Sequence, residues 1–193
     1  MSFGYCGPRV RLVPLDRAKH FENCIRWMND TEVTDGIALV FPLVTSDRET
    51  DWFVHLAKTN TDAVFAIETL EGEHIGNSGI HGIDFRLGIA KTGSLIGEGA
   101  YRGQGLGTEA AHLRAYYAFE ILALRMLYSE YYPHNHGSAN MQRKIGAEIW
   151  GVQPGANFKR GHFVDVVHTW LSRERWRDHA PDWIKDRLHP LAD

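Results

Sequence analysis

The stretch Arg102-Gly103-Gln104-Gly105-Leu106-Gly107-Thr108 lies between an apolar segment, Leu95-Ile96, and a run of helix-forming residues at 109–124. Three glycines at alternate positions predict a backbone that turns tightly and lets a ligand approach closely. Where a strand runs through such a turn into a helix, unpaired N–H groups and the positive end of the helix dipole meet at one point. We therefore expect this turn to hold the phosphate groups of a cofactor.

Two common nucleotide motifs do not fit the turn. A dinucleotide fingerprint needs glycine where Thr108 stands, together with an acidic residue further along a βαβ unit, and the sequence supplies neither. A Walker turn ends in Gly-Lys-Ser or Gly-Lys-Thr, and neither tripeptide occurs in the chain. Taken alone, the stretch could also be a glycine-rich hairpin loop without a ligand.

The bulk composition describes an ordinary globular protein. The chain has 193 residues, 44% of them hydrophobic and 23% charged, which fits a single domain over 1–193 with its core at about 9–176 and a polar tail at 177–193. The net charge of −3 gives no basic footprint for nucleic acid, and it suits an amine acceptor.

Location follows from the same composition. No apolar run approaches the roughly 20 residues that span a bilayer, and the N-terminus lacks the pattern of a signal peptide. Cys6 and Cys24 form no metal or redox motif and are expected to be free thiols. We expect a cytoplasmic protein with no membrane partner.

Hydrophobic periodicity predicts a mixed α/β order of elements. Asp16 is expected to cap the first helix, and Ser46 the second, with Glu49 completing a capping box. The expected strands are 9–15, 63–69, 74–83, 92–97, 126–132, 148–152 and 163–171, with a hairpin loop at 155–161. The expected helices are 19–28, 46–58, 109–124 and 138–144, and the tail from 173 is expected to be partly ordered at best.

The pattern Arg102-x-x-Gly105-x-Gly107 is similar to the coenzyme A signature, Q/R-x-x-G-x-G/A, of the GNAT acetyltransferase superfamily. Residues 101–110 resemble its RimJ/RimL-type branch. Further stretches fit that branch in order along 9–176: Trp27-Met28-Asn29-Asp30 with Glu32-Val33, Phe65-Ala66-Ile67-Glu68 with His74-Ile75-Gly76, Asn135-x-x-Ser138 with Lys144-Ile145-Gly146-Ala147, and Asp165-Val166-Val167 with Arg173-Glu174-Arg175-Trp176.

The resemblance implies a GNAT fold, in which a mostly antiparallel sheet splays between the strand before the glycine turn and the next strand, with helices on its flanks. The pantetheine arm of acetyl-CoA would enter this gap and pair with the strand as a peptide would. A backbone N–H near Ile96 would polarise the thioester carbonyl. The implied cofactor-binding residues are Leu95, Ile96, Gly97, Arg102, Gly103, Gln104, Gly105, Leu106, Gly107, Thr108 and Asn135.

Asn135 matches the family asparagine whose amide bonds the pantetheine, although asparagine is also a routine turn or cap residue. Ser138 matches a position near the thiol and is the candidate catalytic residue, because its hydroxyl could protonate the departing thiolate. Serine is equally common at the start of a helix. His134 and His136 form an H-x-H pattern, but the sequence offers no spaced third ligand, so no metal is expected.

Two positions depart from the family pattern. Gln142 stands where many members carry a tyrosine that acts as general acid, and Lys91 stands at about the position of a catalytic glutamate. The general base is therefore unassigned. Its candidates by location are Glu68, Glu98, Glu130 and His81, and water is the alternative.

The implied reaction is transfer of an acetyl group from acetyl-CoA to a primary amine by direct attack in a ternary complex. The acceptor could be a protein N-terminus, a polyamine, an amino sugar or another small amine, because the acceptor-side loops at 31–44 and 155–161 carry no recognisable motif. The alternatives are a non-catalytic module that senses coenzyme A and a nucleotide-binding regulator. A final hairpin of this kind often makes dimer contacts within the superfamily, so the resemblance also implies a possible homodimer.

Overall fold

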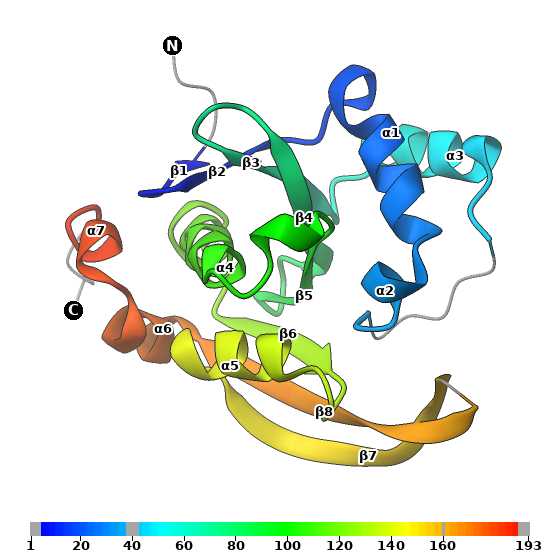
Figure 1. Cartoon of the computed structure of the whole chain (residues 1–193). Helices are drawn as coiled ribbons and strands as arrows, with labels where there is room; N and C mark the ends of the chain where they lie inside the picture. Colours follow the sequence, from blue (N-terminus) through cyan, green and yellow to red (C-terminus); the bar gives the residue numbers. More distant parts are fainter. Residues whose placement is uncertain (1–4, 38–42, 160, 189–193) are drawn as a thin grey trace.

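The computed structural model describes residues 5–37, 43–159 and 161–188. An eight-stranded sheet runs through the molecule in the order β1-β2-β3-β4-β5-β6-β8-β7, with helices on both faces (Figure 1). The strands are β1 (Tyr5–Cys6), β2 (Val10–Pro14), β3 (Ala63–Thr69), β4 (His74–Asp84), β5 (Ile89–Ile96), β6 (Met126–Tyr131), β7 (Glu148–Lys159) and β8 (His162–Ser172). The mixed, mostly antiparallel architecture that the sequence predicted is confirmed.

The helices are α1 (Arg17–Met28), α2 (Thr31–Thr34), α3 (Ser46–Leu56), α4 (Leu106–Tyr116), α5 (His136–Lys144), α6 (Arg173–His179) and α7 (Asp182–Lys185), with a 3-10 turn at Gly99–Tyr101 and a π turn at Tyr117–Ile121. Helix α4 begins three residues earlier than predicted. Its alanines 110, 111 and 115 are buried, and their small side chains let the helix lie close to the sheet. Phe119 in the π turn is also buried, whereas Ile121 is exposed.

The sheet has one parallel seam, between β5 and β6. These strands pair over only three residue pairs, from Ile89↔Met126 to Lys91↔Tyr128, while all other neighbours pair antiparallel. Beyond Lys91 the edge of β5 has no strand partner and the two strands diverge. The predicted splay between the strand before the glycine turn and the next strand is therefore present. It divides the sheet into two parts, β1–β5 and β6–β8–β7.

The cap of α3 corrects a prediction. Thr45, not Ser46, is the N-cap, and its hydroxyl accepts the N–H of Arg48 at 3.3 Å. Ser46 is the first helical residue, so the capping box expected between Ser46 and Glu49 does not form. Two adjacent residues could cap this helix by composition, and the extended backbone at Thr45 selects that one. Glu49 turns inward and is buried.

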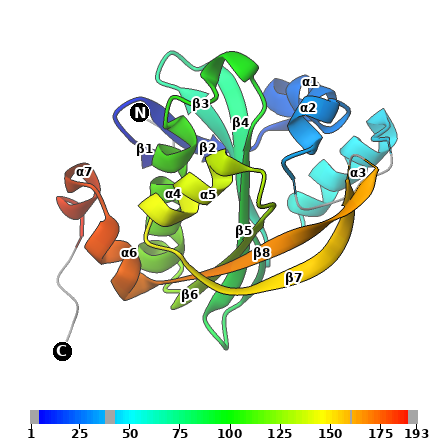
Figure 2. The ribbon, with the colours of Figure 1, turned by 60° about the horizontal axis from the view of Figure 1, so that its bottom comes forward.

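The last hairpin is longer than predicted. Strands β7 and β8 run almost to its tip, so the expected loop at 155–161 is mostly strand (Figure 2). Register irregularities between Ile149 and Gly151 and between Gln153 and Asn157 absorb the glycine and proline residues. The arm exposes the apolar side chains of Ile149, Trp150, Val152, Phe158 and Phe163. A homodimer through this hairpin stays a prediction.

The expectation of a partly ordered tail was wrong for residues 173–188. Ser172 caps α6, and the side chains of Trp176 and Ile184 are fully buried. Arg173 and Arg177 both pair with Glu120 at the end of the α4 region. The polar composition of the tail concealed these few apolar anchors. Residues 189–193 lie outside the described part of the chain.

Candidate active site

A single cavity of about 1090 Å³ extends from the glycine turn, along the open edge of β5, to helices α1, α2 and α3. Its lining brings together most of the residues that the sequence singled out: Leu95, Ile96, Arg102, Gly103, Gly105, Leu106, Gly107, Thr108, Asn135 and Ser138. We call the part near the glycine turn the donor end and the part near α1–α3 the acceptor end.

The backbone of the donor end offers free N–H groups. Within the described chain, the N–H groups of residues 103–107 donate no hydrogen bond, while that of Thr108 returns to the carbonyl of Gly105. Gly103 and Gly105 have φ of 75° and 82°, a left-handed conformation that glycine adopts without steric cost. These unpaired donors at the start of α4 fit a pyrophosphate.

Glu109 fixes this turn to the sheet, a role that the sequence motifs did not indicate. Its buried carboxylate accepts the N–H groups of Arg9 and Val10 at 2.7 and 2.9 Å. The guanidinium of Arg9 pairs with the same carboxylate and also donates to the carbonyl of Gln104 at 2.9 Å. The sequence does hold one signal for this anchor: Glu109 lies in the first turn of the helix and is followed directly by residues that are buried.

Arg102 lines the cavity, and its side chain binds the backbone at the end of β5. Its guanidinium donates to the carbonyls of Ile96 and Gly97, both at 3.0 Å. Two predicted cofactor residues, Gly97 and Gln104, flank the cavity in the chain and are not part of its lining. Gly97 packs against the indole of Trp27, where an added Cβ would approach to 2.1 Å, and the Gln104 side chain donates to the Ala100 carbonyl.

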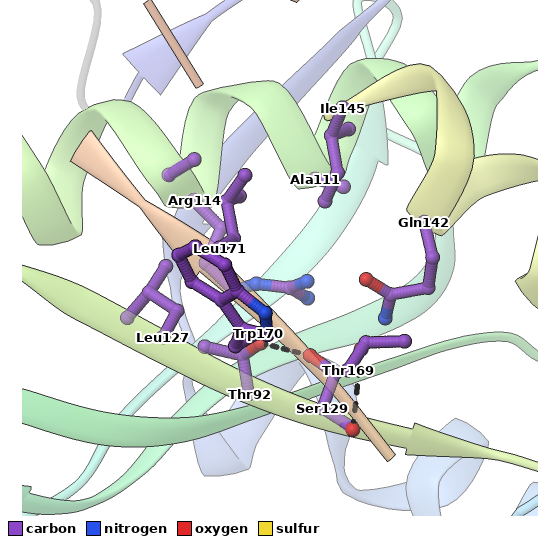
Figure 3. A pocket seen from close by; sticks show the side chains of 11 residues that line it. Thr92, Ala111, Arg114, Leu127, Ser129, Gln142, Ile145, Thr169, Trp170 and Leu171 are labelled. Atoms are coloured by element: carbon purple, nitrogen blue, oxygen red, sulfur yellow. Dashed lines mark hydrogen bonds between the residues drawn. The ribbon is translucent and has the colours of Figure 1, made fainter. Parts of the chain in front are cut away.

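Just past the last pair of the β5–β6 seam, a hydroxyl pair bridges the two strands. Thr92 Oγ1 and Ser129 Oγ lie 2.7 Å apart (Figure 3). A small void of about 10 Å³ lies behind them, bounded by α4, α5 and β8. Its walls include Arg114 and Gln142 (Figure 3).

Arg114 places an unpaired positive charge at the gap. The side chain is buried, and its Nη1 donates to Ser78 Oγ at 3.0 Å and to the Gly93 carbonyl at 2.9 Å. No carboxylate pairs with it among the described residues, and burial lowers its pKa to about 10. Gln142, which replaces the family tyrosine, is also buried here.

Asn135 and Ser138 lie where β6 gives way to α5. The Asn135 side chain caps α5 by accepting the Ser138 N–H at 3.0 Å, and its Nδ2 donates to the Gly36 carbonyl at 3.0 Å. The amide thus joins α5 to the segment after α2. The Ser138 hydroxyl donates and accepts no hydrogen bond within the described ranges.

The four candidate bases separate by position. Glu68 is buried between Arg11 and His20, and Glu98 bonds Arg26 and Trp27; neither faces the cavity. Burial alone would raise the pKa of Glu68, but its hydrogen bonds from Arg11 and His20 lower the pKa overall.

The other two candidates, Glu130 and His81, line the cavity. Glu130 is held by Lys91 Nζ at 2.6 Å, and His81 Nδ1 lies 3.0 Å from Asp62 Oδ1.

Glu49 is a buried acid that the sequence assigned only to a cap. It lines the acceptor end, is 4% exposed, and its Oε1 has no hydrogen-bond partner in the described structure. Burial raises its pKa to about 7. His134 stacks on Tyr132 with its Nε2 3.6 Å from Asp35, and no group of three potential metal ligands occurs in the described ranges.

The unpaired N–H groups at the start of α4 and the open edge of β5 beside them are features that suit an anionic cofactor with a peptide-like arm. A family model described as "Acetyltransferase (GNAT) domain" matches residues 9–148, so the chain belongs to this family. The predictions of family, of enzyme class and of acetyl-CoA as the acyl donor are confirmed. The finer RimJ/RimL-type assignment stays a prediction.

Solved structures share the fold. A spermidine N-acetyltransferase from Vibrio cholerae, in complex with CoA and spermine, superposes with a TM-score of 0.82 at 17% identity, covering 88% of this chain and 99% of that one. Mutant forms of the spermidine/spermine N-acetyltransferase SpeG from the same organism give 0.79 at 16% identity, covering 91% and 100%. The comparison with curated proteins gave no match. Among the described residues, no helix combines the length and apolar character needed to cross a bilayer.

Proposed function

We propose that the protein transfers an acetyl group from acetyl-CoA to a small primary amine, with both substrates bound in the one cavity. The observation that carries this proposal is the continuity of the cavity, which joins free backbone donors at one end to imidazole and carboxylate side chains at the other. Such continuity lets an amine reach a thioester directly, so no covalent acyl-enzyme is needed.

At the donor end, the N–H groups of Gly103, Gln104, Gly105, Leu106 and Gly107 bind the pyrophosphate, and Thr108 closes the first turn beneath it. The free edge at Leu95 and Ile96 orients the pantetheine arm, and Arg102 adds charge at the mouth of the gap. Bound acetyl-CoA supplies the activated acyl carbonyl. Gly97 supports this end by letting the backbone pass close to the indole of Trp27.

At the centre, we assign Ser138 as the residue that returns a proton to the departing thiolate, because its hydroxyl is free and faces the cavity. Asn135 holds the segment after α2 in place through Gly36, and its amide lies within the same lining. Gln142 cannot replace a titrating tyrosine, so a serine acid fits this chain better.

The acceptor end favours a cationic amine such as a polyamine. Glu32 and Asp35 line it beside the buried acid Glu49, and the whole chain is acidic. The polyamine-binding relatives of the same fold support this choice. A protein N-terminus or an amino sugar carries fewer positive charges than a polyamine and would need fewer carboxylates at the acceptor end. A module that only senses coenzyme A would need no carboxylates there.

The test is a panel of amines. Free thiol release from acetyl-CoA is followed with spermidine, glucosamine and an alanine-terminated peptide, and unfolding temperature is followed with acetyl-CoA, ATP and NAD. We expect stabilisation by acetyl-CoA alone and fastest thiol release with spermidine. Stabilisation without turnover of any amine would favour the sensing module, and the absence of stabilisation would overturn both.

A further inference from the structure

His81 and Glu49 each bring a basic atom without a hydrogen-bond partner to the lining of the cavity, and of the two it is the His81 ring that a carboxylate orients. Its Nδ1 is held by Asp62, while its Nε2 takes part in no hydrogen bond within the described structure. We propose that His81 is the general base that removes the proton from the acceptor amine, and that Asp62 is the positioning residue that orients it. This proposal rests on the proposed function.

Asp62 is well placed to fix the imidazole. Its side chain is mostly buried and accepts hydrogen bonds from His81 at 3.0 Å and from the hydroxyl of Thr61 at 3.1 Å. Burial alone would raise the pKa of Asp62, but the bonds from His81 and Thr61 lower it overall. A carboxylate at Nδ1 requires the proton on that nitrogen, so the lone pair of the neutral ring lies on Nε2.

The glycines of the sheet direct Nε2 into the cavity. A Cβ added to Gly79 would lie 2.2 Å from His81 Nε2, so the imidazole leans along β4 over Gly79. Gly93 stands opposite Gly79 on β5, with nothing within 4 Å of the space its Cβ would fill. The ring therefore leans along β4 in the direction of the Asn77–Leu95 pair, over a floor without side chains at Gly79 and Gly93.

The other charged groups near His81 are engaged or distant from its ring. Lys91 stands opposite His81 on β5, but its Nζ bonds Glu130 on β6 at 2.6 Å. His168 on β8 lies 3.6 Å from the same Glu130 carboxylate. From the helical side, Glu49 of α3 lines the cavity, and no hydrogen bond or ion pair joins it to the imidazole within the described residues.

The reaction balances with this assignment. His81 Nε2 takes one proton from the ammonium, the neutral nitrogen forms a bond to the acyl carbon, and the C–S bond breaks. The second proton of the attacking nitrogen reaches the thiolate through Ser138, giving amide and free thiol. The proton on His81 leaves to solvent, so the net products are amide, thiol and one proton.

The experiment compares His81→Gln and Asp62→Asn with the whole wild-type chain, using acetyl-CoA and the panel amine that the wild type converts fastest. General bases contribute about 10²–10⁴-fold, so we expect kcat of His81→Gln to fall about 100-fold or more at pH 7.5. The deficit should shrink as pH rises toward 10, because the amine then deprotonates unaided. Asp62→Asn should show a smaller loss of about 10-fold.

A second readout does not depend on turnover. The nitrogen chemical shifts of the His81 ring should show the Nδ1–H tautomer in the wild type and a change of tautomer population in Asp62→Asn. His55→Gln is the matched control, since His55 is an exposed histidine outside the cavity lining. It should keep wild-type rates, and all variants should keep acetyl-CoA-dependent stabilisation.

If the wild type turns over and His81→Gln shows the same rate and the same pH profile, this inference is overturned and the proposed function stands. An Nε2–H tautomer in the wild type would overturn the role of Asp62. Absence of turnover with every panel amine, despite acetyl-CoA binding, would overturn the proposed function itself and this inference with it.

Discussion

The donor end and the acceptor end of the cavity are built from different material. The donor end uses backbone N–H groups and a strand edge, which a short glycine motif can shape within a few consecutive residues. The acceptor end uses side chains from separate elements: Glu49 on α3 and His81 on β4, the latter held by Asp62, which precedes β3. A site that binds its ligand through backbone groups can therefore be predicted from a short sequence motif. A site built from side chains of separate elements can be identified only in the folded structure.

The largest expected effect tests how far the helix that follows the glycine turn depends on the C-terminal helices. Trp176 is fully buried and its ring lies 5.6 Å from Phe119, at the end of the α4 region. Trp176→Ala should lower the free energy of unfolding by about 3–5 kcal/mol, because it leaves a large cavity. Chemical denaturation measures this change.

The matched control for that variant is Trp150→Ala. Trp150 is 61% exposed on the β7 arm, so its loss should change stability by less than about 0.5 kcal/mol. Equal effects of the two substitutions would show that the C-terminal helices do not support α4.

The next effect tests backbone recognition directly. Gly105→Val forces a β-branched residue into a left-handed conformation at the start of α4, which strains the turn and redirects its N–H groups. Affinity for acetyl-CoA should fall on the order of 100-fold, as measured by calorimetry.

Gly99→Ala provides the comparison, because Gly99 lies outside the predicted phosphate turn and has open space at its Cβ position. This substitution should leave affinity unchanged. Wild-type affinity in Gly105→Val would show that the phosphates bind elsewhere.

The smallest effect concerns the buried charge of the acceptor end. Burial raises the pKa of Glu49 to about 7, well above its unfolded value, so the folded chain holds a proton that the unfolded chain releases. Stability is therefore retained below about pH 4 and falls as pH rises toward 7. Glu49→Gln should remove this loss, on the order of 1–2 kcal/mol between pH 5 and pH 8.

Denaturation at both pH values measures that difference. Glu22→Gln, at an exposed acid on α1, should keep the wild-type difference. The same pH dependence in Glu49→Gln and wild type would show that Glu49 is ionised without cost in the folded state.

Much of the donor end could be predicted from the sequence, because local conformation and function coincide there. The glycine turn, the following helix and the open strand edge depend on neighbours in the chain, and the family pattern covers them. The errors fall where several residues compete for one role. Thr45 and Ser46 both favour an N-cap, and only the path of the backbone decides between them.

The acceptor end depends on contacts between distant residues. His81 was one of four candidate bases, and nothing in its local sequence indicated that Asp62 would hold one nitrogen while Gly79 made room for the other. The helical tail was missed for a similar reason, since Trp176 and Ile184 are isolated apolar residues whose partners lie on other elements.

The short β5–β6 seam also has a mechanical consequence. The two parts of the sheet, β1–β5 and β6–β8–β7, meet at three residue pairs, the Thr92–Ser129 bridge and the Lys91–Glu130 ion pair. A load applied across the sheet would concentrate on this seam, so the two parts would separate as intact bodies before either unzipped. The gap into which the cofactor arm is expected to fit is thus also a line within the sheet that few inter-strand bonds cross.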